Sequence, residues 1–424
     1  MFYLRVYIRL AFFTFCSLLP HQYQAFFPDE QADDNPIIKA YKYSTFVANC
    51  GETIQQQFSA LNSTSDRLFI SFSNGQGAND RIVGLLTGFY AAYLSNRKFQ
   101  ISTTRIHADF SVAFDPSLID WRVVGDAYET LQTTYEHRIN SPEIKVLAHH
   151  NGEPLFTTKF GNEEHDIRPD TVPTIMGDTP TIVFQHNRGN VYRLMKESEY
   201  KEKFEAAKIR PEYGVYCAFH FLFRPNTEVL QLAEPFSSQL GDPAVLKIGI
   251  QIRTGDSALV DGNAHSSLQD TPYYQNSFAC AEYLEKLHNP DGSKSVKWYF
   301  MSDSLQLRKD VKETYGDKVV TDVGRPPLHS GNANELSDRI EGMKLVMAEV
   351  LTFSLCDYFI VSYNSHIAKL GVWISNNRRE DNTFVEHRLG KVEPDQEQCR
   401  PYRDHDMAIG GPGIRKLDEE IKLR

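Results

Sequence analysis

One stretch of the chain, residues 357–375, reads DYFIVSYNSHIAKLGVWIS and decides the fold class. Its first six residues carry a short, uninterrupted apolar run, which is typical of a strand buried on both faces. Small polar residues follow, and residues 365–375 then repeat apolar side chains at helical spacing. A buried strand that runs straight into a helix is half of a β–α–β unit. The stretch therefore predicts an α/β protein with a parallel sheet.

The same alternation recurs in two parts of the chain. Expected strands cover residues 68–72, 98–102, 181–185, 247–253, 296–301, 318–323 and 357–362. Expected helices cover residues 79–95, 228–240, 272–287, 305–315, 335–354 and 365–375. Residues 104–178 are less periodic and contain five prolines, so mixed loops and short helices are expected there. The pattern predicts two Rossmann-like lobes whose parallel sheets face a cleft.

The N-terminus has the pattern of a secretory-pathway signal. Residues 1–19 read MFYLRVYIRLAFFTFCSLL, with Arg5 and Arg9 before an apolar run. That run of about ten residues is too short for an ordinary span, but the segment forms a short anchor if both arginines reach the interface. Because no clean cleavage site follows, an uncleaved anchor is slightly favoured over a cleaved signal peptide. Either of these places the rest of the chain in a lumen or outside the cell, and a cytosolic amphipathic start is the third, least favoured alternative.

Composition excludes several classes of protein. The 424 residues include 45 Lys+Arg and 55 Asp+Glu, a net charge of −10, and a phosphate-held nucleic-acid binder would instead show a basic stripe. Six cysteines form no C-x-x-C pair, so neither a zinc ribbon nor a redox motif is encoded. They are compatible with one or two long-range disulfides. The Asp404-His405-Asp406 triplet lies in the irregular tail rather than at a strand end, so a metal site is not expected there.

Ligands of open parallel sheets bind beyond the carboxyl ends of the strands, and glycines follow the first expected strand there. Residues 74–81 read NGQGANDR, which lacks both the third glycine of a dinucleotide fingerprint and a P-loop G-K-[ST]. Gly75 and Gly77 would let a ligand approach the backbone, and Asn79 is expected to cap the next helix. The loop is either an anion or hydroxyl site at a helix start or a plain tight turn.

Three later strand ends carry polar residues suited to a nucleotide. Gln251 and Arg253 share a strand face, and a guanidinium fork there suits a diphosphate, although a surface ion pair is the alternative. Asp303, after Ser302, either accepts hydrogen bonds from a ribose or base or caps the next helix. Ser365 begins a helix, which is either an anion site or simple N-capping. No G-x-S-x-G hydrolase motif is present.

In order along the chain, these motifs resemble those of the GDP-fucose-dependent fucosyltransferase superfamily, and most closely the plant xyloglucan α-1,2-fucosyltransferase-like family. The matching segments lie at residues 75–81, 93–97, 219–226, 249–253 and 357–365, within a resemblance that covers about residues 66–376. Two departures stand out. The glycine loop is one residue longer than the usual G-x-G-N-R, and the family's C-terminal pattern is not reproduced around Cys399.

The resemblance implies a GT-B fold and an inverting transfer of L-fucose from GDP-β-L-fucose to a hydroxyl of a glycan acceptor, without cofactor or metal. Carried over by position, Arg253 would hold the diphosphate. The residues near the nucleoside would be Gln251, Ser302 and Asp303. Ser365 and the amide of His366 would bind phosphate. Gly75, Gly77 and Asn79 would face the reaction centre. Candidates for the base are Asp256 and Asp261, with Asp109 a distant third.

The predicted organisation follows from the patterns and the resemblance together. It comprises a signal-anchor or signal peptide (1–20), a stem (21–45), an N-terminal acceptor-side lobe (46–226), a C-terminal nucleotide-sugar-binding lobe (227–380) and a tail (381–424). We expect a Golgi membrane protein with a lumenal catalytic domain, or alternatively a secreted one, which touches the membrane only through its N-terminus. The alternative function is a non-catalytic carbohydrate- or nucleotide-sugar-binding protein of the same fold.

Overall fold

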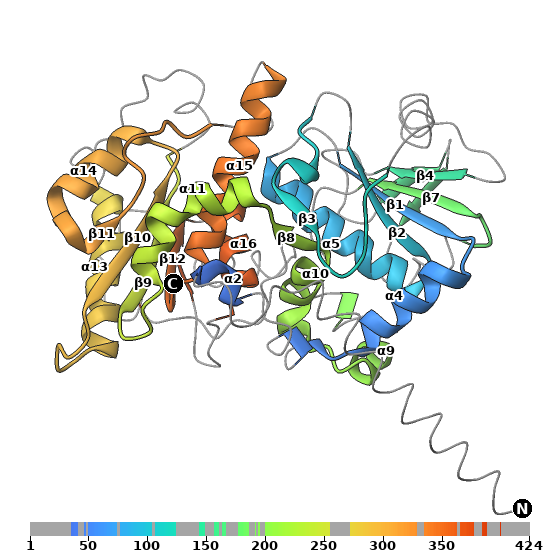
Figure 1. Ribbon diagram of the computed structural model, residues 1–424, viewed down its shortest axis with the longest axis horizontal. Helices are drawn as coiled ribbons and strands as arrows, with labels where there is room; N and C mark the ends of the chain where they lie inside the picture. Colours follow the sequence, from blue (N-terminus) through green and yellow to red (C-terminus); the bar gives the residue numbers. More distant parts are fainter. Residues whose placement is uncertain are drawn as a thin grey trace, which may run out of the picture.

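The computed structural model is mixed α/β, with two parallel sheets on either side of a central group of helices (Figure 1). The described residues are 35–40, 46–47, 50–73, 77–103, 107–123, 144–148, 157–160, 163–166, 177–185, 191, 194–195, 200–254, 272–328, 335–362, 365–376, 384–387 and 399. Within these ranges, no helix combines the length and apolar character needed to cross a membrane. The expected anchor at 1–20 lies outside them.

The first sheet has four parallel strands in the order β2-β1-β7-β4. They are β1 (Leu68–Ser73), β2 (Lys98–Thr103), β4 (Ile144–Ala148) and β7 (Thr181–Gln185). The strands predicted over 68–72, 98–102 and 181–185 are confirmed. β4 was not predicted, because its five residues have no helical pattern beside them and lie in the stretch expected to form loops.

The second sheet has five parallel strands in the order β11-β10-β9-β12-β13. They are β9 (Leu246–Ile252), β10 (Val296–Ser302), β11 (Val319–Val320), β12 (Tyr358–Ser362) and β13 (Phe384–His387). All seven residues of the central strand β9 are buried, which explains its nearly continuous apolar run. The strand expected over 318–323 shortens to β11, since a 3-10 turn occupies Gly316–Lys318 and residues 321–323 are not in a strand. β13 pairs with β12 although the sequence predicts a tail from residue 381.

The helices predicted over 79–95, 228–240, 272–287, 305–315, 335–354 and 365–375 are found close to those positions, whereas the helices over 53–64 and 214–222 were not predicted. The longer ones are α4 (Thr53–Thr64), α5 (Ala78–Leu94), α10 (Gly214–Leu222), α11 (Thr227–Ser237), α13 (Pro272–His288), α14 (Leu305–Tyr315), α15 (Leu336–Phe353) and α16 (His366–Ile374). Shorter ones are α2 (Pro36–Ala40), α9 (Lys201–Ala206) and the 3-10 turns η1 (Phe110–Val112), η2 (Pro211–Tyr213) and η3 (Ser238–Leu240). Two small antiparallel pairs join β3 (Phe114–Pro116) to β8 (Phe223–Pro225), and β5 (Thr157–Phe160) to β6 (Glu163–Asp166). The expectation of only loops and short helices over 104–178 is therefore wrong.

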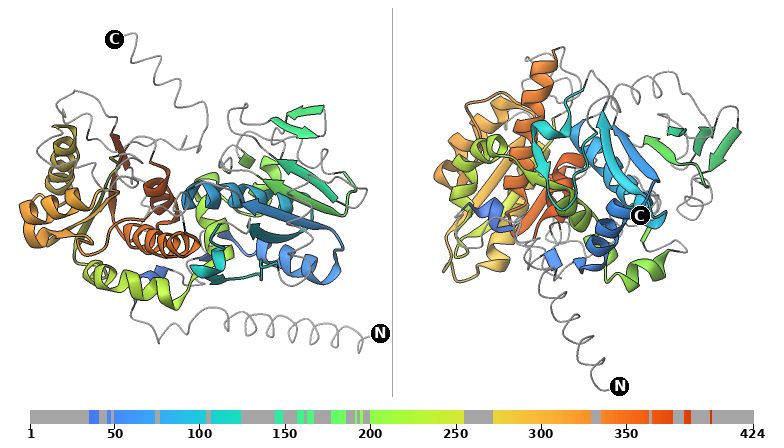
Figure 2. Two further views of the ribbon diagram at one scale, coloured as in Figure 1. Left: turned by 90° about the horizontal axis from the view of Figure 1, so that it is seen from above. Right: turned by 45° about the vertical axis from the view of Figure 1, so that its right-hand side comes forward.

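One continuous apolar core joins the two halves of the molecule. It runs from α4, beside the first sheet, through α5 and α10 to α15 and α16, and these last four helices lie between the sheets (Figure 2). On the face of α5 that meets α16, Val83 packs against Trp373. Where α15 covers β9, a Cβ on Gly249 would lie 2.7 Å from the ring of Phe353, so this close approach requires glycine. The two sheets therefore share one packed core.

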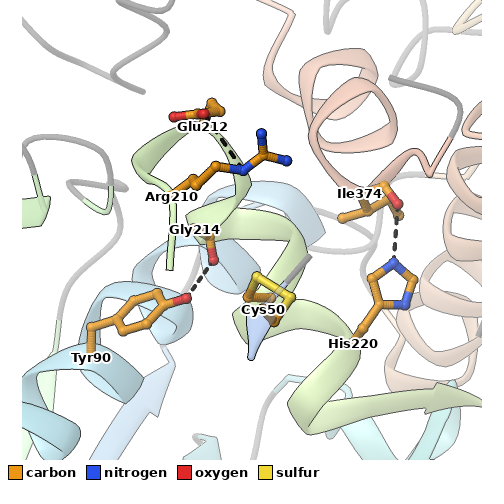
Figure 3. The surroundings of a disulfide bond; sticks show 8 residues. Cys50, Tyr90, Arg210, Glu212, Gly214, His220 and Ile374 are labelled. Atoms are coloured by element: carbon orange, nitrogen blue, oxygen red, sulfur yellow. Dashed lines mark hydrogen bonds and ion pairs between the residues drawn. A yellow bond between two sulfur atoms is a disulfide. The ribbon is translucent and has the colours of Figure 1, made fainter. Parts of the chain in front are cut away.

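Hydrogen bonds and a disulfide reinforce this junction (Figure 3). Tyr90 donates from its hydroxyl to the carbonyl oxygen of Gly214 at 2.7 Å, and Nε2 of buried His220 lies 3.0 Å from the carbonyl oxygen of Ile374. Cys50 and Cys217 form a disulfide that links the segment before α4 to α10.

A second disulfide, between Cys280 and Cys399, fastens the C-terminal region to α13. The two disulfides close sequence separations of 167 and 119 residues. The expectation of one or two long-range disulfides is confirmed.

Candidate functional site

The carboxyl ends of β9, β10 and β12 lie side by side at one edge of the second sheet. In the strand register, Gln251 pairs with Met301 on one side and with Val361 on the other. Arg253, Asp303 and Ser362 therefore reach the same edge. This edge is the position where α/β proteins bind their ligands.

Side chains from the neighbouring strands hold the end of β9. The amide of Arg253 donates to Oγ of Ser362 at 3.0 Å, and the same hydroxyl donates to the carbonyl oxygen of Gln251 at 3.2 Å. Oε1 of Gln251 in turn accepts from the amide of Ser362 at 3.3 Å. The Gln251 side chain thus joins β9 to β12, and its predicted contact with a nucleoside stays a prediction.

Asp303 holds Thr254, the second residue after the end of β9. Its Oδ1 accepts hydrogen bonds from the amide of Thr254 at 2.7 Å and from the Thr254 hydroxyl at 3.0 Å. The N-cap of α14 is Ser304, whose side chain accepts from the amide of Leu307. Of the two interpretations of Asp303, helix capping is therefore wrong. Its predicted role beside a nucleoside is not tested by these contacts.

A buried arginine supports the end of β10. Nε of Arg308 donates to the carbonyl oxygen of Ser302 at 2.7 Å, and the guanidinium pairs with the carboxylate of Glu349 on α15, with Nη2 to Oε2 at 3.1 Å. Burial would lower the pKa of Arg308, but the charge and hydrogen bonds of Glu349 raise it above its usual value. The sequence did not reveal this pair, because an arginine in an amphipathic helix usually faces water. Ser302 itself is buried, and its Oγ accepts from the amide of Ser304.

Ser365 lies at the start of α16 and does not cap it with its side chain. Its hydroxyl is 0% exposed and has no hydrogen-bond partner in the part of the chain that the structure describes. A buried, unpaired hydroxyl is uncommon in native cores. This one lies where free amide groups and the helix dipole favour an anion. His366 begins α16, and its side chain lies outside the described residues.

The first sheet contributes Asn79, in the opening turn of α5. The helix begins at Ala78 with Gly77 as its N-cap, so the expectation that Asn79 caps the helix is wrong. Asn79 is 4% exposed, and neither polar atom of its side chain has a hydrogen-bond partner within the described ranges. Gly75 and the candidate bases Asp256 and Asp261 lie outside the described residues.

Two residues further along α5, Arg81 organises the segment after β2. Its Nη2 donates to the carbonyl oxygen of Ala108 at 2.6 Å, and its guanidinium carbon lies 4.6 Å from the centre of the Phe110 ring. Burial lowers the pKa of Arg81 to about 10, and the charge of Asp109 partly opposes this. Asp109, the third candidate base, caps η1 by accepting from the amide of Ser111 at 2.8 Å.

Metal ligands do not gather in the described part of the molecule. Across those ranges, no group of three or more His, Cys, Asp or Glu side chains could hold a metal ion. The Asp404-His405-Asp406 triplet lies outside them.

Comparison with known proteins supports the fold. No protein-family model matches the chain, and no curated protein matches its sequence. Among solved structures, it is similar to a mutant of Arabidopsis thaliana FUT1 in complex with GDP, with a TM-score of 0.52 and 14% identity over 82% of this chain and 78% of that one. The expected α/β class with parallel sheets is confirmed by this likeness.

Two weaker likenesses were also found. The α-1,6-fucosyltransferase NodZ from Bradyrhizobium, soaked with GDP-fucose, has a TM-score of 0.41 and 13% identity over 73% of this chain and 92% of that one. POFUT1 in complex with GDP has a TM-score of 0.41 and 11% identity over 77% of this chain and 100% of that one.

The buried His220 predicts an acid sensitivity of the junction between the sheets. Burial lowers its pKa from 6.5 to about 4, although the hydrogen bond to Ile374 opposes this. Between those two values the unfolded chain takes up the proton, so the free energy of unfolding falls as pH falls. We expect the wild type to lose about 2 kcal/mol more than His220→Gln between pH 7 and pH 4.5. Urea unfolding at both pH values measures this, and the same pH dependence in both proteins would contradict it.

Proposed function

We propose that the protein is an inverting fucosyltransferase, which transfers L-fucose from GDP-β-L-fucose to a hydroxyl of a glycan acceptor. The observation that carries the proposal is the buried, unpaired hydroxyl of Ser365 at the start of α16, a helix that follows the same sheet edge as Arg253. A guanidinium, a hydroxyl and helix-start amides together suit a diphosphate. The fold likeness to a GDP-bound structure supports the same nucleotide.

In this proposal the C-terminal lobe binds the donor and stabilises its departure. Arg253 holds the diphosphate, while Ser365 and the amide of His366 bind a phosphate oxygen. As the bond between fucose C1 and the β-phosphate oxygen breaks, negative charge grows on GDP beside these groups. Groups arranged in advance around that charge lower the barrier, and no metal ion is required in the scheme.

The acceptor oxygen attacks C1 from the opposite face, and its proton passes to a base. Asp256 and Asp261 remain our candidates for this base, with Asp109 behind them because its carboxylate already caps η1. Asn79, Gly75 and Gly77 would face the reaction centre from the N-terminal, acceptor-side lobe. The unpaired amide of Asn79 supports this place for it, since no described residue uses either of its polar atoms.

We propose the Golgi lumen as the compartment, with the N-terminal segment as anchor. The two disulfides support a secretory environment, because such bonds persist in oxidising compartments. A secreted form is the alternative.

Replacing Arg253 with alanine should weaken GDP binding about ten- to hundredfold, because a charge-assisted hydrogen bond contributes about 1.5–3 kcal/mol. Calorimetry with GDP measures the change. The matched control is Arg224→Ala, which removes a partly exposed arginine whose Nη2 lies 3.8 Å from Asp115 and should leave GDP affinity unchanged. Equal GDP affinity in folded Arg253→Ala and wild type would contradict the assignment.

A screen of nucleotide-sugar donors against an array of glycan acceptors tests the reaction itself. We expect transfer from GDP-fucose alone among the donors, with inversion at C1, and we expect the rate to persist in excess EDTA. A strict requirement for an added divalent ion would contradict the metal-free scheme. GDP binding without transfer to any glycan would favour the non-catalytic alternative, and transfer from a different sugar nucleotide would reject the donor.

A further inference from the structure

His107 is a buried side chain with unused hydrogen-bonding capacity. It is 7% exposed, and neither ring nitrogen has a hydrogen-bond partner among the residues that the structure describes. His220 is also buried, but its Nε2 lies 3.0 Å from the carbonyl oxygen of Ile374. Both side chains are buried imidazoles, but only that of His220 has a described hydrogen-bond partner.

An unpaired polar group costs about 1–3 kcal/mol when it is buried, so native proteins keep few of them. None of the described residues pairs with the ring nitrogens of His107. They therefore remain available to a ligand. This cost is the first reason to place a ligand beside His107.

The position of His107 in the fold is the second reason. It follows the carboxyl end of β2, the edge at which a parallel sheet binds ligands. The adjoining turn η1 packs against α15, which belongs to the second sheet's half of the molecule. Arg81, on α5, fixes the segment that carries His107 by donating a hydrogen bond to the carbonyl oxygen of Ala108. His107 therefore lies where the two halves meet, a usual place for substrate sites.

The electrostatic surroundings decide which chemistry suits the ring. Burial, together with the positive charges of Arg81 and Arg339, lowers the pKa of His107 from 6.5 to about 4. The imidazole is therefore neutral near neutral pH, so one ring nitrogen donates a hydrogen bond and the other accepts one. A neutral donor–acceptor pair fits sugar hydroxyls, which both donate and accept.

We propose that His107 binds hydroxyl groups of the acceptor glycan and so helps to select and orient it. This inference rests on the proposed transfer reaction. The acceptor is favoured over the donor as the source of the hydroxyls, because His107 follows the first sheet whereas the donor candidates Arg253 and Ser365 follow the second.

The test uses the full chain labelled with ¹⁵N-histidine and saturated with GDP. The probe is a panel of methyl glycosides of common hexoses and pentoses, followed through the ring nitrogen signals by NMR. The His107→Gln spectrum assigns the His107 signal, and the His220→Gln spectrum assigns the control. We expect at least one glycoside to shift the His107 signal and to leave that of His220 in place.

Affinity for that glycoside should fall about tenfold or more in His107→Leu and recover in part in His107→Gln, whose amide also donates and accepts. GDP affinity should stay unchanged in both variants. The inference is overturned if no glycoside shifts His107, if His107→Leu binds as the wild type does, or if GDP-fucose alone produces the shift. Failure to bind GDP would instead reject the proposed function, so the two failures are distinguishable.

Discussion

The hydroxyl of Ser362 accepts a hydrogen bond from the amide of Arg253 and donates one to the carbonyl oxygen of Gln251, so β9 and β12 end level with each other. On the other side of β9, Oδ1 of Asp303 accepts hydrogen bonds from the amide and the hydroxyl of Thr254. These contacts bring an arginine and a helix start to one edge of the second sheet. Arg308 and Glu349 support that edge from beneath by holding the end of β10. The candidate donor site depends on this alignment.

The shared core fixes the position of this edge relative to the first sheet. α5 follows β1 and carries Asn79, and α16 follows β12 and has Ser365 as its N-cap, so these two helices carry candidate groups from both sheets. Val83 and Trp373 pack these helices together, and the His220 contact with Ile374 adds a polar link. The proposed transfer requires donor and acceptor in one geometry, which a packed junction provides better than a flexible linker does.

Much of this fold could be predicted from the sequence, because fully buried parallel strands and amphipathic helices leave strong periodic patterns. The helix over 305–315 and the strand over 181–185 match the structure at both ends. β4 and β13 were missed because each is short and has no adjacent helical pattern. The strand expected over 318–323 was predicted too long, because β11 has only two residues.

Only part of the candidate site could be predicted from the sequence. Arg253, Asp303 and Ser365 were found because polar residues directly after apolar strands stand out. Ser362, Thr254 and Arg308 were missed, since their roles come from neighbours that are distant in the chain. His107 gave no signal, because burial and the lack of a described partner are properties of the fold alone.

The central claim is that a nucleoside diphosphate binds where β9 ends and α16 begins. Hydrogen exchange with and without saturating GDP tests it most directly, because a bound phosphate protects the amides that contact it. The account predicts slower exchange over residues 366–368, with little change in the first turn of α5. Protection confined to the first sheet, or none at the start of α16, would contradict it.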